Sequence, residues 1–350
     1  MAVRFYLAGL TMDYKQQILN ILHSTPTSRV AMTKTLNITR AYVTKLTAGL
    51  LSDGIIEESD VKDAPLGRPQ QLLAVKAGRL FSINVMIRTY GLQASLNDYN
   101  TTRPALATVN YPLSGAMKTQ RLAEMLDALV AELCAQAGVA REQVKALGVA
   151  LQGGIEQYSG VVRWCPVLEE RNINLRDIIC SRSGITTQIV NIAWCSCYMI
   201  NKRTHSRESW VAFMPGFGSL GFGYCIDGQP GLGDNGFYPE IVHLPYASGL
   251  ENAFLFDPAT PQQSAQRMAE ALYFAICCTA PIHNIKRVIL TGELFEDYVD
   301  LIMPITHCLL RENPSEHINT IRLEYMKASY NYSMVGLVQL SADAITATLL

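Results

Sequence analysis

The sequence of 350 residues contains no long uncharged apolar run, although 49% of its residues are hydrophobic and only 17% are charged. Without about eighteen consecutive apolar residues, a membrane-spanning helix is not expected. The apolar run at residues 6–10 is too short for the core of a secretory signal. The nine cysteines include no Cys-x-x-Cys pair, and an odd number of thiols does not suit a disulfide framework. These absences predict a cytoplasmic globular protein that does not insert into a membrane.

Acidic residues are missing between Asp13 and Asp53. The basic residues of that segment are Lys15, Arg29, Lys34, Arg40 and Lys45. Residues 1–78 carry nine Lys/Arg and six Asp/Glu, a net charge of +3, whereas the remaining residues have a net charge of −4. A basic segment on an otherwise acidic chain is typical of a polyanion contact. A solvated helical face would give the same pattern, so both interpretations stay open here.

The first 78 residues predict three short helices followed by a two-stranded wing. Apolar spacing predicts helices at residues 13–23, 29–36 and 39–51, with Ser28 capping the second and Asn37 in the left-handed turn before the third. Extended runs at residues 55–59 and 71–75 flank a polar loop. This order is that of a winged helix-turn-helix, in which the third helix reads the major groove.

Candidate DNA contacts lie at the helix starts, on the polar face of the third helix and at the wing tip. Side chains in these places can bond phosphates and base edges, and an arginine at the wing tip can enter the minor groove. The candidates are Ser28, Thr39, Arg40, Tyr42, Thr44, Lys45 and Arg68. Winged helices also serve as protein-docking modules, and this alternative stays open.

Beyond residue 78, strand-like and helix-like segments alternate. Strands are expected at residues 81–87, 91–97, 146–151, 185–190, 210–213, 223–226, 288–290 and 321–325, and helices at 118–137, 193–201, 262–279, 293–310 and from 333 onward. Such alternation predicts a mixed or parallel sheet covered by helices, in one or two lobes. We therefore expect an α/β protein with a winged helix at residues 1–78 and a larger domain at residues 79–350.

Several runs of the sequence resemble a known family. The run SRVAMTKTLNITRAYVTKLTAGLLSDGIIEES, followed by LGRPQQLLAV, resembles the winged helix of ROK-family regulators. The segments GVVRWCPVL, GFGYCIDGQ and PEIVH resemble parts of the ROK sugar-kinase domain. The resemblance covers nearly the whole chain from about residue 13. It implies a two-lobed, actin-like domain that follows the winged helix, dimerises and senses a signal.

The chain departs from the family kinases at both catalytic motifs. Their phosphate-binding hairpin carries Asp, Gly, Gly and Thr, where residues 84–88 here are Asn, Val, Met, Ile and Arg. Their catalytic Asp follows the strand equivalent to residues 185–190, where this chain has Asn191 and no Asp or Glu anywhere from residue 178 to 207. Sugar phosphorylation needs a carboxylate base beside the attacking hydroxyl. A degenerate family member with no ATP and no kinase activity is therefore expected.

The family zinc site is also incomplete. It uses one His and three clustered Cys, and His243 matches the histidine. No cysteine lies between Cys225 and Cys277, so three of the four ligands are missing. We expect no metal and no cofactor.

The resemblance places an effector site in the cleft of the large domain. The matching residues are Gly153, Gly154, Asn191, Glu240, His243 and Glu251. In the family these positions line the cleft or contact sugar hydroxyls, so a sugar-like effector is one expectation. A retained structural pair of Glu240 and His243 at a lobe hinge is the alternative.

The pattern as a whole predicts a sequence-specific transcriptional regulator, a repressor by resemblance, that binds double-stranded DNA. A homodimer or higher oligomer would present two recognition helices to a palindromic operator. The large domain would sense a sugar-like effector or a protein partner. One alternative is an interaction protein controlled by a protein partner alone, and another is a divergent sugar kinase, against which the missing carboxylate argues.

Overall fold

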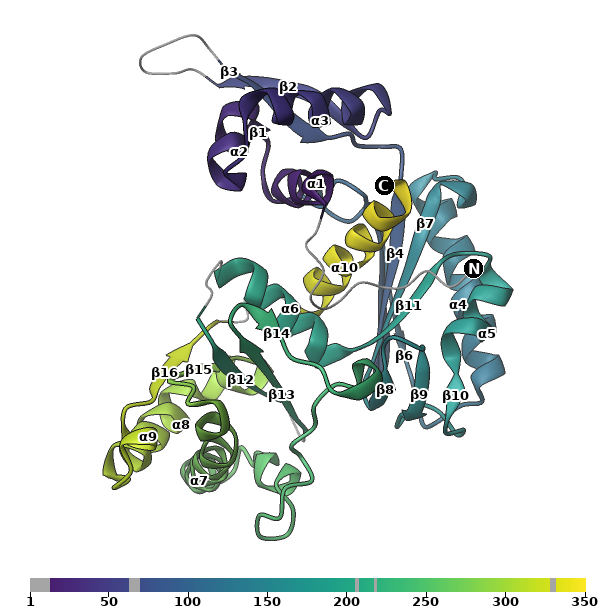
Figure 1. Cartoon of the computed structure of the whole chain (residues 1–350). Coiled ribbons are helices and arrows are strands. Elements are labelled where there is room, and N and C mark those ends of the chain that lie inside the picture. The colour runs from purple at the N-terminus through teal and green to yellow at the C-terminus, as the bar shows by residue number, and fades with distance from the viewer. Residues whose placement is uncertain (1–12, 63–69, 205–207, 217–218, 328–331) are drawn as a thin grey trace. The chain divides into compact units, whose positions relative to one another are not determined.

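The computed structural model describes residues 13–62, 70–204, 208–216, 219–327 and 332–350. The chain divides into two compact units (Figure 1). The first comprises residues 1–153, 158–190 and 337–350, and the second comprises residues 154–157 and 191–336. The C-terminal helix α10 (Tyr332–Leu349) therefore begins in the second unit and ends in the first. Among the described residues, no helix is both long enough and apolar enough to cross a membrane.

The first unit opens with three helices and a small antiparallel sheet. The helices are α1 (Tyr14–Ser24), α2 (Arg29–Leu36) and α3 (Arg40–Ser52). The sheet has the order β1 (Thr27–Ser28), β3 (Gln70–Val75), β2 (Ile56–Lys62). This is the winged helix-turn-helix that the sequence predicts, with a third, two-residue strand that it did not. The loop at residues 63–69, which carries Arg68, lies outside the described residues.

Local sequence signals position these helices. The Ser28 hydroxyl accepts a hydrogen bond from the backbone N–H of Ala31 at 3.3 Å and so caps α2. Asn37 ends α2 in the left-handed conformation, with φ of 52°. Thr39 caps α3 by accepting from the backbone N–H of Tyr42 at 3.3 Å. The predicted Ser28 cap and the left-handed turn at Asn37 are confirmed, whereas Asp13, which the sequence also suggests as a cap, makes no side-chain capping bond to α1. The Thr39 cap was not predicted.

A five-stranded sheet forms the rest of the first unit. Its order is β11 (Thr187–Asn191), β7 (Val144–Leu151), β4 (Phe81–Arg88), β5 (Gly91–Asp98), β6 (Ala107–Pro112). Strands β4, β5 and β6 form an antiparallel meander, and β7 runs parallel to β4. Figure 1 shows α4 (Thr119–Ala137) and α5 (Leu175–Ser183) on one side of this sheet and α10 on the other. The helical turn η1 (Arg141–Gln143) and the short paired strands β9 (Val161–Trp164) and β10 (Ile173–Asn174) complete the unit.

The winged helix packs directly on this sheet and on α10. The His23 and Tyr99 rings form a T-shaped pair with centroids 4.7 Å apart, and the Tyr99 and Thr346 hydroxyls share a hydrogen bond of 2.7 Å. Thr101 donates to the carbonyl of His23 at 3.1 Å. One apolar cluster joins residues of both parts; its buried members are Ile18, Leu19, Leu22, Met32, Val43, Leu46, Leu50, Ile55, Ile56, Leu73, Val75, Tyr99, Ala146, Ala342 and Ile345. The winged helix and the adjoining sheet therefore share one core.

The second unit repeats this sheet order. Its five strands run β14 (Gln229–Pro230), β13 (Ser219–Ile226), β12 (Trp210–Gly216), β15 (Arg287–Leu290), β16 (Arg322–Tyr325). As in the first unit, a three-stranded antiparallel meander is followed by two further strands, and β15 and β16 run parallel to β12. The remaining elements are β8 (Gly154–Glu156), α6 (Ile192–Thr204), η2 (Asp234–Gly236), η3 (Glu251–Phe254), α7 (Pro261–Thr279), η4 (Ala280–His283), α8 (Glu293–Glu312) and α9 (Glu316–Asn319).

The pattern of apolar residues missed eight strands and α-helices: β1, β6, β8, β9, β10, β14, α5 and α9. Strand β6 is an edge strand whose Asn110, Tyr111 and Pro112 are exposed, so its residues do not form an apolar run. Strands β8 to β10 have two to four residues each, which is too short to show a period. Helix α5 has few apolar positions and packs through Leu175 and Ile179. The longer elements were located correctly.

Candidate functional site

The exposed face of α3 is the strongest candidate for a binding surface. Its buried side consists of Val43, Leu46, Thr47 and Leu50. The opposite side carries exposed residues that extend from the helix start into its third turn: Arg40, Ala41, Tyr42, Thr44, Lys45 and Ala48. No acidic residue lies on α3. The helix therefore presents a polar and basic face, of the kind that can bond phosphates and base edges.

Two cations on this face are not engaged with acids. Arg40 and Lys45 have no ion pair among the described residues. Arg29, by contrast, donates to the buried Thr47 hydroxyl at 3.0 Å and lies 3.9 Å from Glu58. Arg29 thus ties α2 to α3 and to the wing, while Arg40 and Lys45 remain available to a polyanion.

The other predicted DNA contacts occupy different environments. Ser28 is 5% exposed, and its hydroxyl both caps α2 and donates to Gln70 at 2.6 Å. Thr39 is exposed at the start of α3, and the Thr44 hydroxyl donates to the carbonyl of Arg40 at 2.9 Å. Arg68 is not described. The structure thus places Ser28 inside the winged helix, away from the exposed face of α3.

Tyr14 is a residue of this surface that sequence reasoning missed. Its ring forms a T-shaped pair with the Tyr42 ring, with centroids 5.7 Å apart and an interplanar angle of 81°. Both rings are more than one third exposed, at 36% for Tyr14 and 39% for Tyr42. The two residues lie on different helices and far apart in the chain, so no sequence period links them.

The predicted effector residues are divided between the units. Gly153 belongs to the first unit, and Gly154, Asn191, Glu240, His243 and Glu251 belong to the second. Gly153 has φ of +126°, and a Cβ there would lie 2.3 Å from the carbonyl oxygen of Trp164, so only glycine fits.

Within the second unit, Glu240 and His243 form a pair. Their side chains approach to 3.7 Å between Oε2 and Nε2, with Glu240 18% exposed and His243 68% exposed. Burial raises the pKa of the Glu240 carboxyl, and the neighbouring His243 partly offsets this. Asn191 is 7% exposed, and its Oδ1 accepts from the backbone N–H of Ala193 at 2.8 Å at the start of α6. Glu251 is exposed in η3.

The hairpin that cradles phosphates in ROK kinases does not fit ATP in this chain. Asn84, at the position of the kinase Asp, is 0% exposed. Its Nδ2 donates to Ser82 at 3.0 Å and to Asn97 at 3.1 Å, and its Oδ1 accepts from Ser341 of α10 at 2.7 Å. All its bonds are thus made inside the first unit, and a side chain so engaged cannot reach a nucleotide or its metal ion.

The thiols do not fit the family zinc site. Among the described residues, no three His, Cys, Asp or Glu side chains gather closely enough to hold a metal ion. Cys195 and Cys197 on α6 are buried, and Cys197 contacts the Tyr238 hydroxyl at 3.2 Å. Burial raises the pKa of Cys197 to about 12 and that of Cys195 further, so both are protonated thiols at neutral pH.

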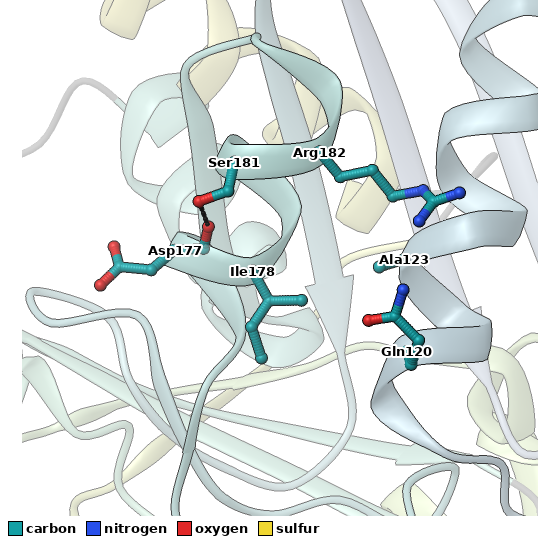
Figure 2. A pocket seen from close by; sticks show the side chains of 6 residues that line it. All are labelled: Gln120, Ala123, Asp177, Ile178, Ser181 and Arg182. Atoms are coloured by element: carbon teal, nitrogen blue, oxygen red, sulfur yellow. Dashed lines mark hydrogen bonds between the residues drawn. The ribbon is translucent and has the colours of Figure 1, made fainter.

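A groove between α4 and α5 has a volume of about 490 Å³ (Figure 2). Its lining residues are Gln120, Ala123, Asp177, Ile178, Ser181 and Arg182. The Ser181 hydroxyl donates to the carbonyl of Asp177 at 2.7 Å, and Arg182 lies 3.7 Å from Glu124. Figure 2 shows these side chains spread along the two helices rather than converging on one point. The polar groups of the groove therefore do not converge on one ligand position.

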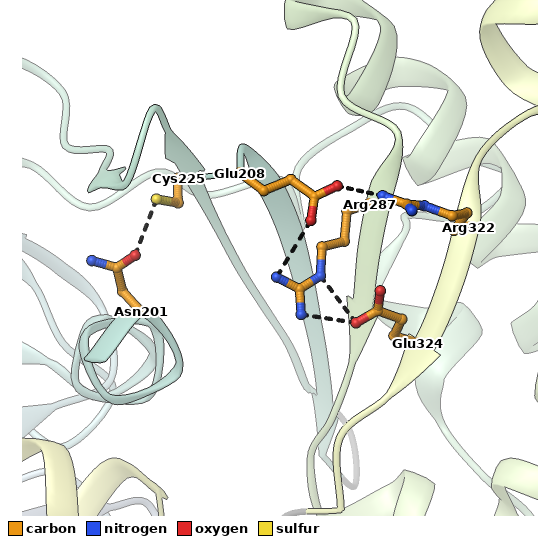
Figure 3. A network of polar contacts seen from close by, with 6 residues as sticks. All are labelled: Asn201, Glu208, Cys225, Arg287, Arg322 and Glu324. Atoms are coloured by element: carbon orange, nitrogen blue, oxygen red, sulfur yellow. Dashed lines mark hydrogen bonds and ion pairs between the residues drawn. The ribbon is translucent and has the colours of Figure 1, made fainter. Parts of the chain in front are cut away.

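A charge network links β15 and β16 in the second unit (Figure 3). Arg287, whose side chain is 12% exposed, donates to one Glu324 oxygen from Nε at 3.0 Å and from Nη2 at 2.9 Å. Glu208 pairs with Arg322 and lies 3.9 Å from Arg287. Two arginines and two glutamates balance one another, so this network stabilises the sheet and offers no excess charge to a ligand.

Comparisons with known proteins find both regulators and kinases. No profile of a known protein family matches the sequence. The DNA-binding transcriptional dual regulator NagC of Escherichia coli strain K12 is 24% identical over 225 residues, which are 63% of this chain and 53% of the relative. The chain thus spans about half the length of the curated relatives it matches.

Solved structures match a larger part of the chain. A ROK family transcriptional regulator, homolog of the E. coli MLC protein, matches 96% of this chain and 99% of its own, with 17% identity and a TM-score of 0.74. A ROK hexokinase from Thermus thermophilus matches 76% of this chain and 99% of its own, with 15% identity and a TM-score of 0.56.

The fold is therefore that of a winged helix-turn-helix followed by a two-lobed, actin-like domain of the sugar-kinase type, as predicted. The sequence relatives include N-acetylglucosamine and xylose repressors, and the structural neighbours include ROK family regulators and kinases, in agreement with the predicted resemblance to the ROK family. Because that family contains both regulators and kinases, the fold alone does not decide the activity.

Proposed function

We propose that this chain is a DNA-binding transcriptional regulator, acting as a repressor, that uses α3 as its recognition helix. The observation that carries the proposal is the acid-free exposed face of α3, where Arg40 and Lys45 have no acidic partner among the described residues. A helix of this kind can bond phosphates and base edges in the major groove. The similarity to NagC, a DNA-binding regulator, supports the same function.

Selection of DNA fragments by the purified chain at near-physiological salt tests this function. We expect wild type to enrich fragments that share a palindromic motif, because a two-fold dimer presents two recognition helices about one helical turn apart. Enrichment without a shared motif would contradict a sequence-specific regulator and would favour control through a protein partner.

We infer that the sugar-kinase-like domain is catalytically inactive and holds no cofactor. The Asn84 bonds close the phosphate hairpin, and the strand β11 ends on Asn191 without a carboxylate base. A phosphoryl transfer of this type requires a base within hydrogen-bond reach of the attacking hydroxyl. A divergent sugar kinase is therefore the weaker candidate.

Zinc loading gives a direct check on the cofactor proposal. After dialysis against zinc and removal of loosely bound metal, we expect metal analysis to find well below one zinc per chain, with no change in the variant His243→Ala. Cys195 and Cys197 should react with a thiol reagent only after unfolding, because they are buried and their pKa values are raised. One zinc per chain that resists a chelator would overturn the proposal.

We propose that this domain dimerises and transmits a signal to the winged helix. The contacts among His23, Tyr99 and Thr346 support this role, because they connect α1, the sheet and α10 within one unit. The signal would be a sugar-like effector at Asn191, Glu240 and His243, or a protein partner. Such a ligand changes the affinity for DNA only by the factor by which it prefers one conformation of the chain over another.

A further inference from the structure

The exposed aromatic pair on the winged helix is the feature that the proposed function leaves unexplained. Tyr14 is the first residue of α1, and Tyr42 lies in the first turn of α3, directly after the exposed Arg40 and Ala41. Their rings meet edge to face at 5.7 Å while each stays more than one third exposed. Among the described residues, neither phenol oxygen has a hydrogen-bond partner inside the protein.

We propose that Tyr42 is a specificity-determining residue whose ring contacts the C5 methyl group of a thymine, and that Tyr14 is a positioning residue that holds this ring. The proposal rests on the proposed DNA-binding function and deepens it. It adds Tyr14, which does not itself lie on α3, to the residues that decide the preferred DNA sequence.

Tyr42 lies where a recognition helix contacts base edges. In helix-turn-helix proteins the N-terminal residues of the recognition helix contact base edges, and Tyr42 lies three residues after the capping residue Thr39. An aromatic ring there offers an apolar surface. The thymine methyl is the apolar group that the major groove presents, since the other edge groups are hydrogen-bond donors and acceptors.

The Tyr14 ring restricts the rotamers that the Tyr42 ring can adopt. An exposed side chain loses rotamer freedom when it binds, and a ring that is already held loses less. The T-shaped contact with the Tyr14 ring holds the Tyr42 ring, and such aromatic pairs are worth about two- to tenfold in an equilibrium constant. The Tyr14 contact therefore fixes the ring before DNA arrives.

The test uses duplexes in which deoxyuridine replaces single thymines of the operator selected by wild type, because this removes only the methyl group. For wild type we expect one position in each half-site to lose about three- to fivefold in affinity, the worth of one buried methyl group. The variant Tyr42→Ala should bind thymine and uracil at that position equally, and Tyr42→Phe should still distinguish them. Affinities are measured by fluorescence anisotropy at fixed salt.

Tyr14→Ala should move the ratio of thymine affinity to uracil affinity toward one, whereas Tyr14→Phe, which keeps the ring, should keep the wild-type ratio. The control is Tyr90→Ala, which removes a ring that is 62% exposed in the turn between β4 and β5. The ratio of thymine affinity to uracil affinity is measured on the same protein sample, so a smaller fraction of folded protein changes both affinities alike. If Tyr14 had only a structural role, Tyr14→Ala would leave this ratio unchanged.

The outcomes separate this proposal from the proposed function. If wild type selects an operator but no uracil substitution affects binding, or if Tyr14→Ala keeps the wild-type ratio, the aromatic proposal is overturned and the regulator stands. If Tyr42→Phe loses as much discrimination between thymine and uracil as Tyr42→Ala, the hydroxyl and not the ring distinguishes the bases. That result also overturns the aromatic proposal. If wild type selects no sequence at all, the proposed function fails and this inference fails with it.

Discussion

Replacing Arg40 by alanine is expected to lower affinity for the selected operator by about 1–3 kcal/mol and to relax the preference at one position of each half-site. Arg40 is the first residue of α3, is exposed, and has no acidic partner among the described residues. An arginine in this place can donate two hydrogen bonds to a guanine edge, which alanine cannot replace. The loss should be much smaller on unrelated DNA.

Lys45→Ala should act differently because a lysine further along the helix is suited to a phosphate. We expect weaker binding to all sequences alike and a decrease of about one in the slope of log affinity against log salt. Titrations of operator and unrelated duplexes at several salt concentrations measure both effects. Arg121→Ala, which removes an exposed cation from α4, is the matched control and should change neither. Unchanged binding in both α3 variants would show that α3 is not the recognition helix.

Restoring the family's acid by Asn84→Asp is expected to destabilise the first unit by about 3 kcal/mol at pH 7 instead of restoring a kinase. The Asn84 amide donates to Ser82 and Asn97, and a carboxylate would lose both donors while placing a charge in a fully buried site. The site has no spare room, because a Cβ on Gly148 would already lie 3.0 Å from the Asn84 Oδ1. Denaturant unfolding against wild type measures the loss.

The pH dependence of this variant has a definite sign. Burial raises the pKa of a carboxyl group, so the acid at position 84 would bind its proton more tightly in the folded state than in the unfolded state. The stability deficit against wild type should therefore be largest at neutral pH and shrink as the pH falls through the raised pKa. Asn110→Asp, on the exposed edge strand β6, makes the same chemical change and should stay within about 0.5 kcal/mol of wild type. Wild-type stability of Asn84→Asp together with ATP-dependent sugar phosphorylation would refute the inactive-domain proposal.

The local chemistry of the winged helix could be predicted because the partners lie close in sequence. Ser28 caps the helix that begins at the next residue by bonding an N–H three residues on, and Asn37 makes its left-handed turn through its own backbone. The absence of a carboxylate after β11 and the missing zinc cysteines were also visible, because an absent residue type needs no coordinates. By contrast, Ser28 was expected on the DNA face, and only its 2.6 Å bond to Gln70 of β3 shows that it lies inside.

The sequence by itself determined the order of elements, the basic segment and the family resemblance, since these depend on short-range periodicity, composition and motif order. Tertiary structure decided which side chains meet. The Ser341 hydroxyl donates to Asn84, a residue 257 positions earlier in the chain, and the Tyr14 ring contacts the Tyr42 ring from another helix. Such pairs form because packed elements bring their surfaces together, and apolar spacing along one element contains no information about its partner. The bonds that enclose Asn84 and the aromatic pair on the exposed surface of α1 and α3 are therefore properties of the fold.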